Sequence, residues 1–570
     1  MASSQEVLYA VRQTEMVEGT DVRNRLLALA VLSAARFVLA SNLLVNTSAE
    51  RATDNGTPEG WGMYLGAGTA RLTRTTEEKH SGQASASLEL TGWHVPKDAK
   101  DTAENRSASA AIILAANDGY RARGALPGTP GTTYAFSFWH KGDVPATVGV
   151  TGWPSSDSDH SARIHHTVVG GTMRPGPAWQ RCTGTVRLRE GVACFALMIQ
   201  ASGKESEGFR LGKLFIDDAA IVAKAYPDGQ LRGIWCGPPK AKEREPGVPE
   251  IAATLDRLKA AGLNAMFVWT TSLYLAALER PELRSADPAA AWDALGELAR
   301  AAHERGMQVH AWYSPWIYKG TGRAVELRDH PEWAAVNAAG VADASGICLA
   351  RPEVRQFELD LLSRLADRCP ELDGIHIEEP GYNWGRYCYC EHCRRLCRDW
   401  YGLDIAGDPP DTRPLLDHLA ASCCTDFMLR LRQALLTRRP EMWLSANGSA
   451  GPNADKDWRM GRDWVTWARR GYLDFYVPQI YTKSVEGFVQ AGQKTKELLG
   501  SCDLVTGLAV SWSSIHPERQ SPRVIQDELR AAEKLGAKGF VVFHLDHLND
   551  EHFAAIREVL RQPQGPAQER

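Results

Sequence analysis

The sequence predicts a two-domain protein, a β-sandwich over residues 42–224 followed by a (β/α)₈ barrel over residues 231–562. Up to residue 223, short alternating runs are separated by Gly, Pro, Ser and Asp without a long helical pattern, which is typical of a sandwich. After the linker AYPDGQ (225–230), eight apolar runs alternate with amphipathic stretches, which is the pattern of a closed barrel. A chain of 570 residues is also too long for one ordinary domain.

The sandwich strands are expected at the alternating runs of the first half. They include SASLEL (85–90), TYAFSFWHKGD (133–143), ATVGVTGW (146–153) and GKLFIDDAAIVA (212–223). Cys182 and Cys194 flank a predicted hairpin, and a disulfide between them is one possibility that spacing alone does not decide.

The barrel strands are expected at eight apolar runs. They are LRGIWCG (231–237), NAMFVW (264–269), MQVHAWYS (307–314), LDGIHIEE (372–379), MWLSANG (442–448), LDFYVPQIY (473–481), DLVTGLAV (503–510) and GFVVFHLDHL (539–548). An open doubly wound sheet is the alternative, but that fold usually carries a Gly-rich phosphate loop after its first strand, and RGIWCGPPKAK lacks it.

The composition and the two ends of the chain limit the expected binding partners and the expected location of the protein. A net charge of −4 argues against a nucleic-acid partner, and no stretch outside the N-terminal segment approaches the length of a membrane span. Residues 1–41 contain Arg23 and Arg25 before LLALAVLSAARFVLAS, which predicts a leader and a secreted or periplasmic protein, with a plain amphipathic helix as the alternative. Residues 563–570 are expected to be a disordered tail. The 18 Trp favour a carbohydrate ligand, and no organic cofactor is expected.

In such barrels the functional residues lie at the carboxyl ends of the strands. That rule selects a short set of candidates: Cys236, Trp269, Ser314, Glu378, Glu379, Asn447, Gln479, Tyr481, Ser511, His544 and Asp546.

Both domains resemble known families. LRGIWCG, HPEWAAVNAAG (330–340), LDGIHIEEPGY and YLDFYVPQIY resemble the glycosyl hydrolase-like 10 barrels, while SGQASASLEL, YAFSFWHKG and LFIDDAAIV resemble jelly-roll carbohydrate-binding modules of families 4, 9 and 22. The resemblance implies a glycoside hydrolase that acts on a poly- or oligosaccharide, with an N-terminal module that binds glycan. A non-catalytic glycan-binding protein on the same scaffolds is the alternative.

The fourth strand carries the predicted catalytic residue. Side chains alternate along a strand, so His376 and Glu378 share the inward face and Glu379 starts from the other face. The glycosyl hydrolase-like 10 group usually has an aspartate at the position of Glu378. Glycoside hydrolysis normally needs a second carboxyl group. The candidates are Asp455, Asp457, Glu379 and Asp546, of which Asp546 is preferred because it follows the eighth strand.

Other polar and aromatic side chains are expected to bind substrate at the same end of the barrel. They are His310, Trp312, His376, Asn447, Gln479, Tyr481 and His544. The long loop 447–464, which contains Trp458, is expected to form one wall of the site.

A cluster of cysteines predicts a second, structural site beside the fourth strand. Cys388, Cys390 and Cys393 have a spacing suited to tetrahedral zinc. CYCEHCRRLCRDW resembles the zinc loop of family 42 β-galactosidases, and that resemblance implies Cys348 as the fourth ligand and a core role for Cys397.

Overall fold

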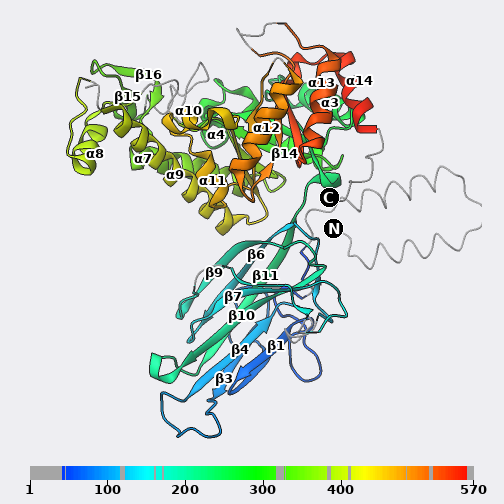
Figure 1. The fold of residues 1–570 in the computed structure, drawn as a ribbon, viewed down its shortest axis with the longest axis vertical. Coiled ribbons are helices and arrows are strands. Elements are labelled where there is room, and N and C mark those ends of the chain that lie inside the picture. The colour runs from blue at the N-terminus through cyan, green and yellow to red at the C-terminus, as the bar shows by residue number, and fades with distance from the viewer. Residues whose placement is uncertain are drawn as a thin grey trace, which may run out of the picture.

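The structure is a computed structural model of the chain. It describes residues 42–44, 46–115, 122–159, 162–169, 172–315, 327, 329–381, 387–407, 412–482, 484–512 and 518–561. The predicted leader 1–41 and tail 563–570 lie outside the described residues. A β-sandwich and a barrel form two separate bodies joined through the end of strand β11 (Figure 1).

The N-terminal body is the predicted sandwich, built from two antiparallel sheets. One sheet has the order β1-β4-β10-β7-β8, with β5 paired to β10, and the other has the order β2-β3-β11-β6-β9. The strands are β1 (Gly62–Ala67), β2 (Thr69–Thr75), β3 (Ser85–Gly92), β4 (Ser107–Ile113), β5 (Leu126–Pro127), β6 (Thr133–Gly142), β7 (Thr147–Trp153), β8 (His165–Val168), β9 (Gly176–Arg187), β10 (Cys194–Lys204) and β11 (Lys213–Lys224). Alternate residues such as Phe136 and Phe138 of β6 face a core that the two sheets share.

The hairpin predicted around Cys182 and Cys194 is wrong. Cys182 lies on β9, paired with Phe138 of β6, whereas Cys194 lies on β10, paired with Trp153 of β7. The chain crosses from one sheet to the other between these strands, and both cysteines are free thiols. The suggested disulfide is therefore not formed.

The C-terminal body is the predicted barrel of parallel strands. Within the described residues eight strand positions form a closed ring, because β12 pairs with β22 and β18 pairs with β19. The strands are β12 (Leu231–Cys236), β13 (Ala265–Thr270), β14 (Gln308–Tyr313), β17 (Gly374–Ile377), β18 (Trp443–Ser449), β19 (Phe475–Gln479), the two-part seventh strand β20 (Asp503–Leu504) and β21 (Thr506–Ala509), and β22 (Gly539–Phe543).

Helices surround the ring, and a short antiparallel pair, β15 (Ala334–Val336) and β16 (Ala342–Ile347), extends from it. The helices are α3 (Arg244–Ala260), α4 (Ser272–Glu279), α5 (Ala294–His303), α7 (Pro352–Arg368), α8 (Glu391–Tyr401), α9 (Arg413–Arg438), α10 (Ala454–Arg459), α11 (Trp464–Arg469), α12 (Val485–Leu499), α13 (Pro522–Lys534) and α14 (Asp550–Arg561). Ser484 and Ser521 fix two of the starts, since each side chain accepts a hydrogen bond from a backbone N–H of the first turn. In the described part of the chain, no helix has the length and apolarity needed to cross a bilayer.

The barrel interior is aromatic, and strand alternation separates it from the outer core. Trp235 and Phe267 belong to the interior cluster, whereas Ile375 and Ile377 pack outward against the helices. Cys236, one of the candidates chosen by strand position, is on this outer side. It is therefore buried beneath the helices instead of facing the interior.

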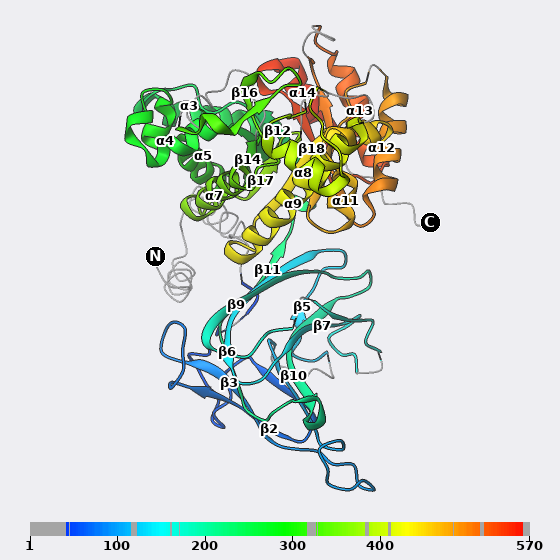
Figure 2. The same ribbon diagram turned by 90° about the vertical axis from the view of Figure 1, so that its left-hand side faces the viewer.

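The sandwich is attached to the end of the barrel where the strands begin. Lys224, the last residue of β11, donates to the carbonyl of Met442 and forms a 2.8 Å ion pair with Asp474, which also binds Arg432. Met442 and Asp474 directly precede β18 and β19. Figure 2 shows the C-terminal end of α9 above β9, where Arg181 donates to the carbonyl of Arg438 at 3.2 Å. The carboxyl ends of the barrel strands therefore face away from the sandwich.

Candidate functional site

Glu378 directly follows β17 at the carboxyl end of the barrel. Its backbone N–H donates to the carbonyl of Tyr313 at 2.8 Å, so the ladder between β17 and β14 continues to this residue and its side chain keeps the inward parity of His376. Two donors then fix one carboxylate oxygen. Trp312 Nε1 lies 2.5 Å from Glu378 Oε2, and Asn447 Nδ2 lies 2.6 Å from the same oxygen.

This setting gives the Glu378 carboxyl group a proton affinity suited to acid–base chemistry. Burial, followed by repulsion from Glu379, raises its pKa to about 7, while the hydrogen bonds from Asn447 and Trp312 hold the pKa down. Both of those donors bind Oε2, and Oε1 makes no hydrogen bond to any described residue. Oε1 is therefore the oxygen that can exchange a proton with a ligand.

Glu379 belongs to a charged network that the sequence did not reveal. Its φ angle of 35° turns the chain out of the extended conformation, so the strand alternation assumed for it ends here. Its backbone N–H donates to Asn447 Oδ1 at 3.0 Å, and its carboxylate pairs with Arg462 at 3.1 Å. Arg462 also lies 3.5 Å from Asp457, which is completely buried and accepts hydrogen bonds from Ser449.

The network assigns a supporting role to Asp457, one of the alternatives for the second carboxyl group. Burial raises its pKa, and Arg462 and Ser449 counteract that rise. Charged residues in the loop 447–464 were the only signal for this network in the sequence. The spacing along that loop did not indicate which of them would meet Glu379.

Aromatic side chains surround this carboxylate pair. The Trp312 ring lies 4.6 Å from the Trp269 ring and 6.4 Å from the His544 ring, measured between centroids. The Tyr481 hydroxyl is buried and has no hydrogen-bond partner among the described residues, and burial followed by the charges of Glu378 and Glu379 raises its pKa well above the usual value. Tyr481 therefore places a buried hydroxyl group close to the two carboxylates.

Two of the expected substrate-binding residues lie deeper in the barrel. His310 and His376 are both completely buried. His310 stacks on Phe267 with 4.7 Å between ring centroids, and burial lowers its pKa to about 4. His376 Nδ1 lies 2.8 Å from Ser445 Oγ, and burial lowers its pKa as well. These rings fill the layers beneath Trp312. The half-buried Gln479 ends β19 beside Ser449 of β18.

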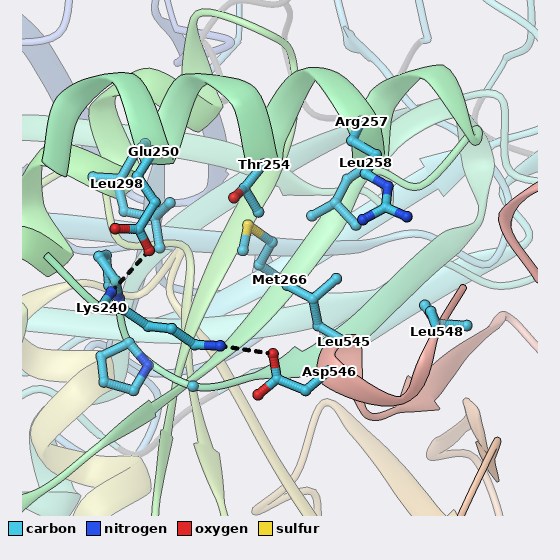
Figure 3. A pocket seen from close by; sticks show the side chains of 14 residues that line it. Lys240, Glu250, Thr254, Arg257, Leu258, Met266, Leu298, Leu545, Asp546 and Leu548 are labelled. Carbon is cyan, nitrogen blue, oxygen red and sulfur yellow. Dashed lines mark hydrogen bonds and ion pairs between the residues drawn. The ribbon is translucent and has the colours of Figure 1, made fainter. Parts of the chain in front are cut away.

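Asp546, the preferred second carboxylate, binds a lysine at the rim. It forms a 3.1 Å ion pair with Lys240 and lines a hollow of about 370 Å³ under α3 (Figure 3). His544 Nδ1 lies 3.9 Å from the Asp546 carboxylate. Among the described residues no hydrogen bond or ion pair joins Asp546 to Glu378. The neighbouring carboxylate that acts on the pKa of Glu378 is Glu379.

The four cysteines selected from the sequence come together in one buried group. The Sγ atoms of Cys348, Cys388, Cys390 and Cys393 all lie within 4.8 Å of one another, with 3.4 Å between Cys348 and Cys393. Cys348 directly follows β16, while Cys390 and Cys393 begin α8, so the group ties two segments of the chain together. Cys397 is buried one turn further along α8, outside the group.

This donor set suits a tetrahedral thiophilic metal. A Zn–S bond of about 2.3 Å places the sulfur atoms of a tetrahedral site about 3.8 Å apart, and Cys390 lies 3.8 Å from Cys348. Hydrogen bonds among the four thiols lower the pKa of Cys390 and raise the pKa values of Cys348 and Cys393, so the four groups are electrostatically linked. Four thiolates fill the coordination shell, so the group has no open position for a catalytic water.

Comparison with known proteins confirms the family resemblance of the barrel. The model of the glycosyl hydrolase-like 10 family matches residues 230–507. Glycosyl hydrolase YngK of Bacillus subtilis (strain 168) is 22% identical over 312 residues, which cover 47% of this chain and 57% of that relative. The chain thus matches little more than half the length of the curated relative.

Solved structures of glycoside hydrolases are among the proteins to which this chain is similar at low identity. The PgaB (BpsB) glycoside hydrolase domain from Bordetella bronchiseptica is 14% identical, with a TM-score of 0.44, and covers 59% of this chain and 100% of that domain. Gan42B, a GH42 β-galactosidase from G. stearothermophilus, is 16% identical, with a TM-score of 0.44, and covers 59% of this chain and 56% of its own. The matching family is described as glycosyl hydrolase-like, and the curated relative is described as a glycosyl hydrolase.

Proposed function

We propose that the protein is a glycoside hydrolase in which Glu378 is the proton donor to the departing sugar. The observation that carries this proposal is a carboxyl group at the end of the fourth barrel strand whose pKa is raised to about 7 while one of its oxygens is fixed by Trp312 and Asn447. A general acid works best when its pKa lies near the operating pH, and a fixed Oε2 leaves Oε1 to carry the transferred proton.

Glu379 is the second carboxylate of the proposed reaction. Arg462 is almost completely buried and forms a 3.1 Å ion pair with Glu379, which holds this carboxylate in place next to Glu378. An ionised carboxylate beside the reacting carbon stabilises the positive charge that develops in an oxocarbenium-like transition state. The half-buried Tyr481 and His544 are positioned to bind sugar hydroxyl groups.

The test begins with a screen of the full chain against polysaccharides and aryl glycosides, and continues with variants on the substrate that it identifies. Glu378→Gln keeps the size of the side chain and removes proton transfer, so kcat is expected to fall by about 10²–10⁴-fold. Glu379→Gln should lose less, because Glu379 supplies charge and no proton. Asp546→Asn is the matched control, since its carboxylate pairs with Lys240.

Full activity of Glu378→Gln would contradict the assignment of the proton donor. A loss in Asp546→Asn as large as that in Glu378→Gln would transfer the second role from Glu379 to Asp546. If no substrate is cleaved although glycans bind, the protein is instead a non-catalytic glycan-binding protein.

We also propose that the cysteine group holds a structural zinc ion bound by Cys348, Cys388, Cys390 and Cys393. The distances, the burial and the soft donor set support this assignment. The ion would fix the start of α8 against the segment after β16.

The sandwich is proposed to bind glycan. His80 stacks on Trp139 of β6 with 3.9 Å between centroids and meets the edge of Trp179 of β9 at 6.0 Å, which forms an aromatic cluster on the outer side of one sheet. Among the described residues, the buried core of the sandwich is drawn from positions 44–221, so the domain has its own core and can be expressed alone. Affinity electrophoresis of residues 42–223 in gels that contain polysaccharide tests this role. A folded domain that ignores every glycan cleaved by the full chain would be a structural module.

A further inference from the structure

A second hollow lies at the carboxyl end of the barrel, beside the carboxylate network. It has a volume of about 850 Å³, and its lining comes from the segment before α8, the start of α9, and α10 with its flanking residues. Helices of a barrel run antiparallel to its strands, so the start of α9 is at the same end of the barrel as Glu378. The other end of α9 reaches the sandwich.

Helix α10 connects this hollow to the network around Glu379. Asp457 of α10 points inward and contacts Arg462, the partner of Glu379. Its neighbours Lys456, Trp458 and Arg459 are exposed and line the hollow. The loop after Glu379 packs directly on the same segment, since a Cβ atom at Gly381 would lie 2.2 Å from the carbonyl oxygen of Met460. The hollow and the proposed catalytic pair therefore share one supporting element.

The lining combines an exposed indole ring with excess positive charge. Trp458 is 36% exposed, although large apolar side chains are usually buried. Three basic side chains, Arg413, Lys456 and Arg459, oppose two acidic ones, and one of these, Asp417, already accepts a hydrogen bond from Tyr387. The Arg459 guanidinium makes no hydrogen bond or ion pair within the described residues.

These groups match one kind of sugar. A flat indole ring packs on the apolar face of a pyranose, and exposed aromatic side chains in a hollow mark ligand-binding surfaces. A guanidinium binds a carboxylate or sulfate through two parallel hydrogen bonds, which a neutral sugar cannot accept with the same strength. The net positive lining also attracts anionic chains at long range.

We propose that this hollow is a subsite for an anionic sugar, which makes the substrate an acidic glycan. This inference rests on the proposed glycoside hydrolase function. Trp458 stacks on the pyranose ring and Arg459 binds its carboxylate or sulfate, while the neighbouring part of the chain reaches Glu378.

Binding measurements test the subsite without requiring turnover. The Glu378→Gln full-length protein is titrated by calorimetry with oligogalacturonate, alginate and hyaluronan oligosaccharides, with their carboxyl-reduced counterparts, and with a sulfated galactan oligosaccharide. At least one anionic oligosaccharide is expected to bind about tenfold or more tightly than its neutral counterpart, and this preference should weaken with added salt. The uronate and sulfate arms identify which anionic group is preferred.

Variants of the lining residues then test whether the preference for anionic oligosaccharides arises in this hollow. In the same Glu378→Gln background, Arg459→Gln is expected to weaken binding of the anionic oligosaccharide about tenfold and to leave the neutral one unchanged. Trp458→Ala should weaken both. Arg523→Gln is the matched control, because Arg523 is an exposed arginine of α13, far from the hollow in the sequence.

Three results would overturn the subsite: equal affinity for charged and neutral oligosaccharides, an unchanged preference in Arg459→Gln, or an equal loss in Arg523→Gln. These results are distinct from failure of the proposed function. An Arg459-dependent preference in a protein that cleaves nothing would refute the hydrolase and retain the subsite. Cleavage of a neutral glycan without any preference for anionic oligosaccharides would refute the subsite and retain the hydrolase.

Discussion

Trp312→Phe is expected to raise the pKa of the proposed proton donor. The substitution removes the indole N–H that lies 2.5 Å from Glu378 Oε2 and keeps an aromatic ring in the interior. The N–H stabilises the ionised carboxylate more than the protonated acid, so its loss favours the proton. Asn447 still donates to the same oxygen.

The size of the shift follows from the strength of that hydrogen bond. A hydrogen bond to a charged group is worth about 1.5–3 kcal/mol, and part of it survives when the acid is protonated. One pKa unit corresponds to about 1.4 kcal/mol. The pKa of Glu378, which is about 7 in the parent protein, should therefore rise by about one unit in the variant.

The assay is the pH dependence of kcat/KM on the substrate found by the screen. A general acid must be protonated to act, so activity is expected to fall as the pH rises through about 7 in the parent protein. In Trp312→Phe this descending limb should move to about pH 8. Trp269→Phe is the control, because Trp269 contacts the Trp312 ring edge to face and makes no hydrogen bond to Glu378 in the described structure.

The pH at which kcat/KM falls tests the role of Glu378, and it does not depend on the absolute rate of the variant. A descending limb that stays in place in Trp312→Phe would show that Glu378 does not set it. An equal shift in Trp269→Phe would attribute the effect to altered packing. An ascending limb near pH 7 would indicate that Glu378 acts as the ionised carboxylate.

Three further predictions concern stability and metal. Glu528 is a completely buried carboxyl group without a hydrogen-bond partner in the described residues, and burial raises its pKa to about 8. Between about pH 4.5 and 8 the folded state therefore keeps a proton that the unfolded state loses, so the free energy of unfolding falls as the pH rises through this window. Glu528→Leu should stabilise the protein by roughly 2–4 kcal/mol at pH 8.5 and by much less at pH 4. Denaturant unfolding at both pH values measures this difference. The parent protein should carry about one zinc per chain by elemental analysis. Cys390→Ser should lower both the zinc content and the Tm, whereas Cys397→Ser should keep the metal. Parent protein that contains no zinc after purification without chelator would refute the site. Asp474→Asn should destabilise the protein by about 3–5 kcal/mol because it leaves two buried cations uncompensated, and an unchanged Tm would contradict this account of the domain junction.

Both folds and the inward position of Glu378 could be predicted from the sequence. Side-chain periodicity is a local property, so an alternating run of apolar and polar residues indicates a strand. The regular alternation of eight apolar runs with amphipathic helices indicates the closed barrel that the structure contains. The same alternation placed His376 and Glu378 on one face. The close spacing of Cys388, Cys390 and Cys393 likewise lies within one short segment, where geometry follows from sequence.

The depth of these side chains in the barrel and their interaction partners could not be predicted from the sequence. Strand alternation gives the face of a residue but not its height in the barrel, which depends on the stagger between neighbouring strands. His310 and Trp312 share one face of β14, yet His310 is sealed in the interior while Trp312 reaches Glu378.

The pairing of charges is equally non-local. Asp546 binds Lys240 across 306 positions of sequence, and Arg462 binds Glu379 across a segment that contains β18 and the helices α8, α9 and α10. Glu379 also leaves the strand conformation, so side-chain alternation does not predict the direction of the Glu379 side chain. Electrostatic partners are chosen by distances in three dimensions, and a chain that closes into a ring brings together residues whose sequence separation carries no information about those distances.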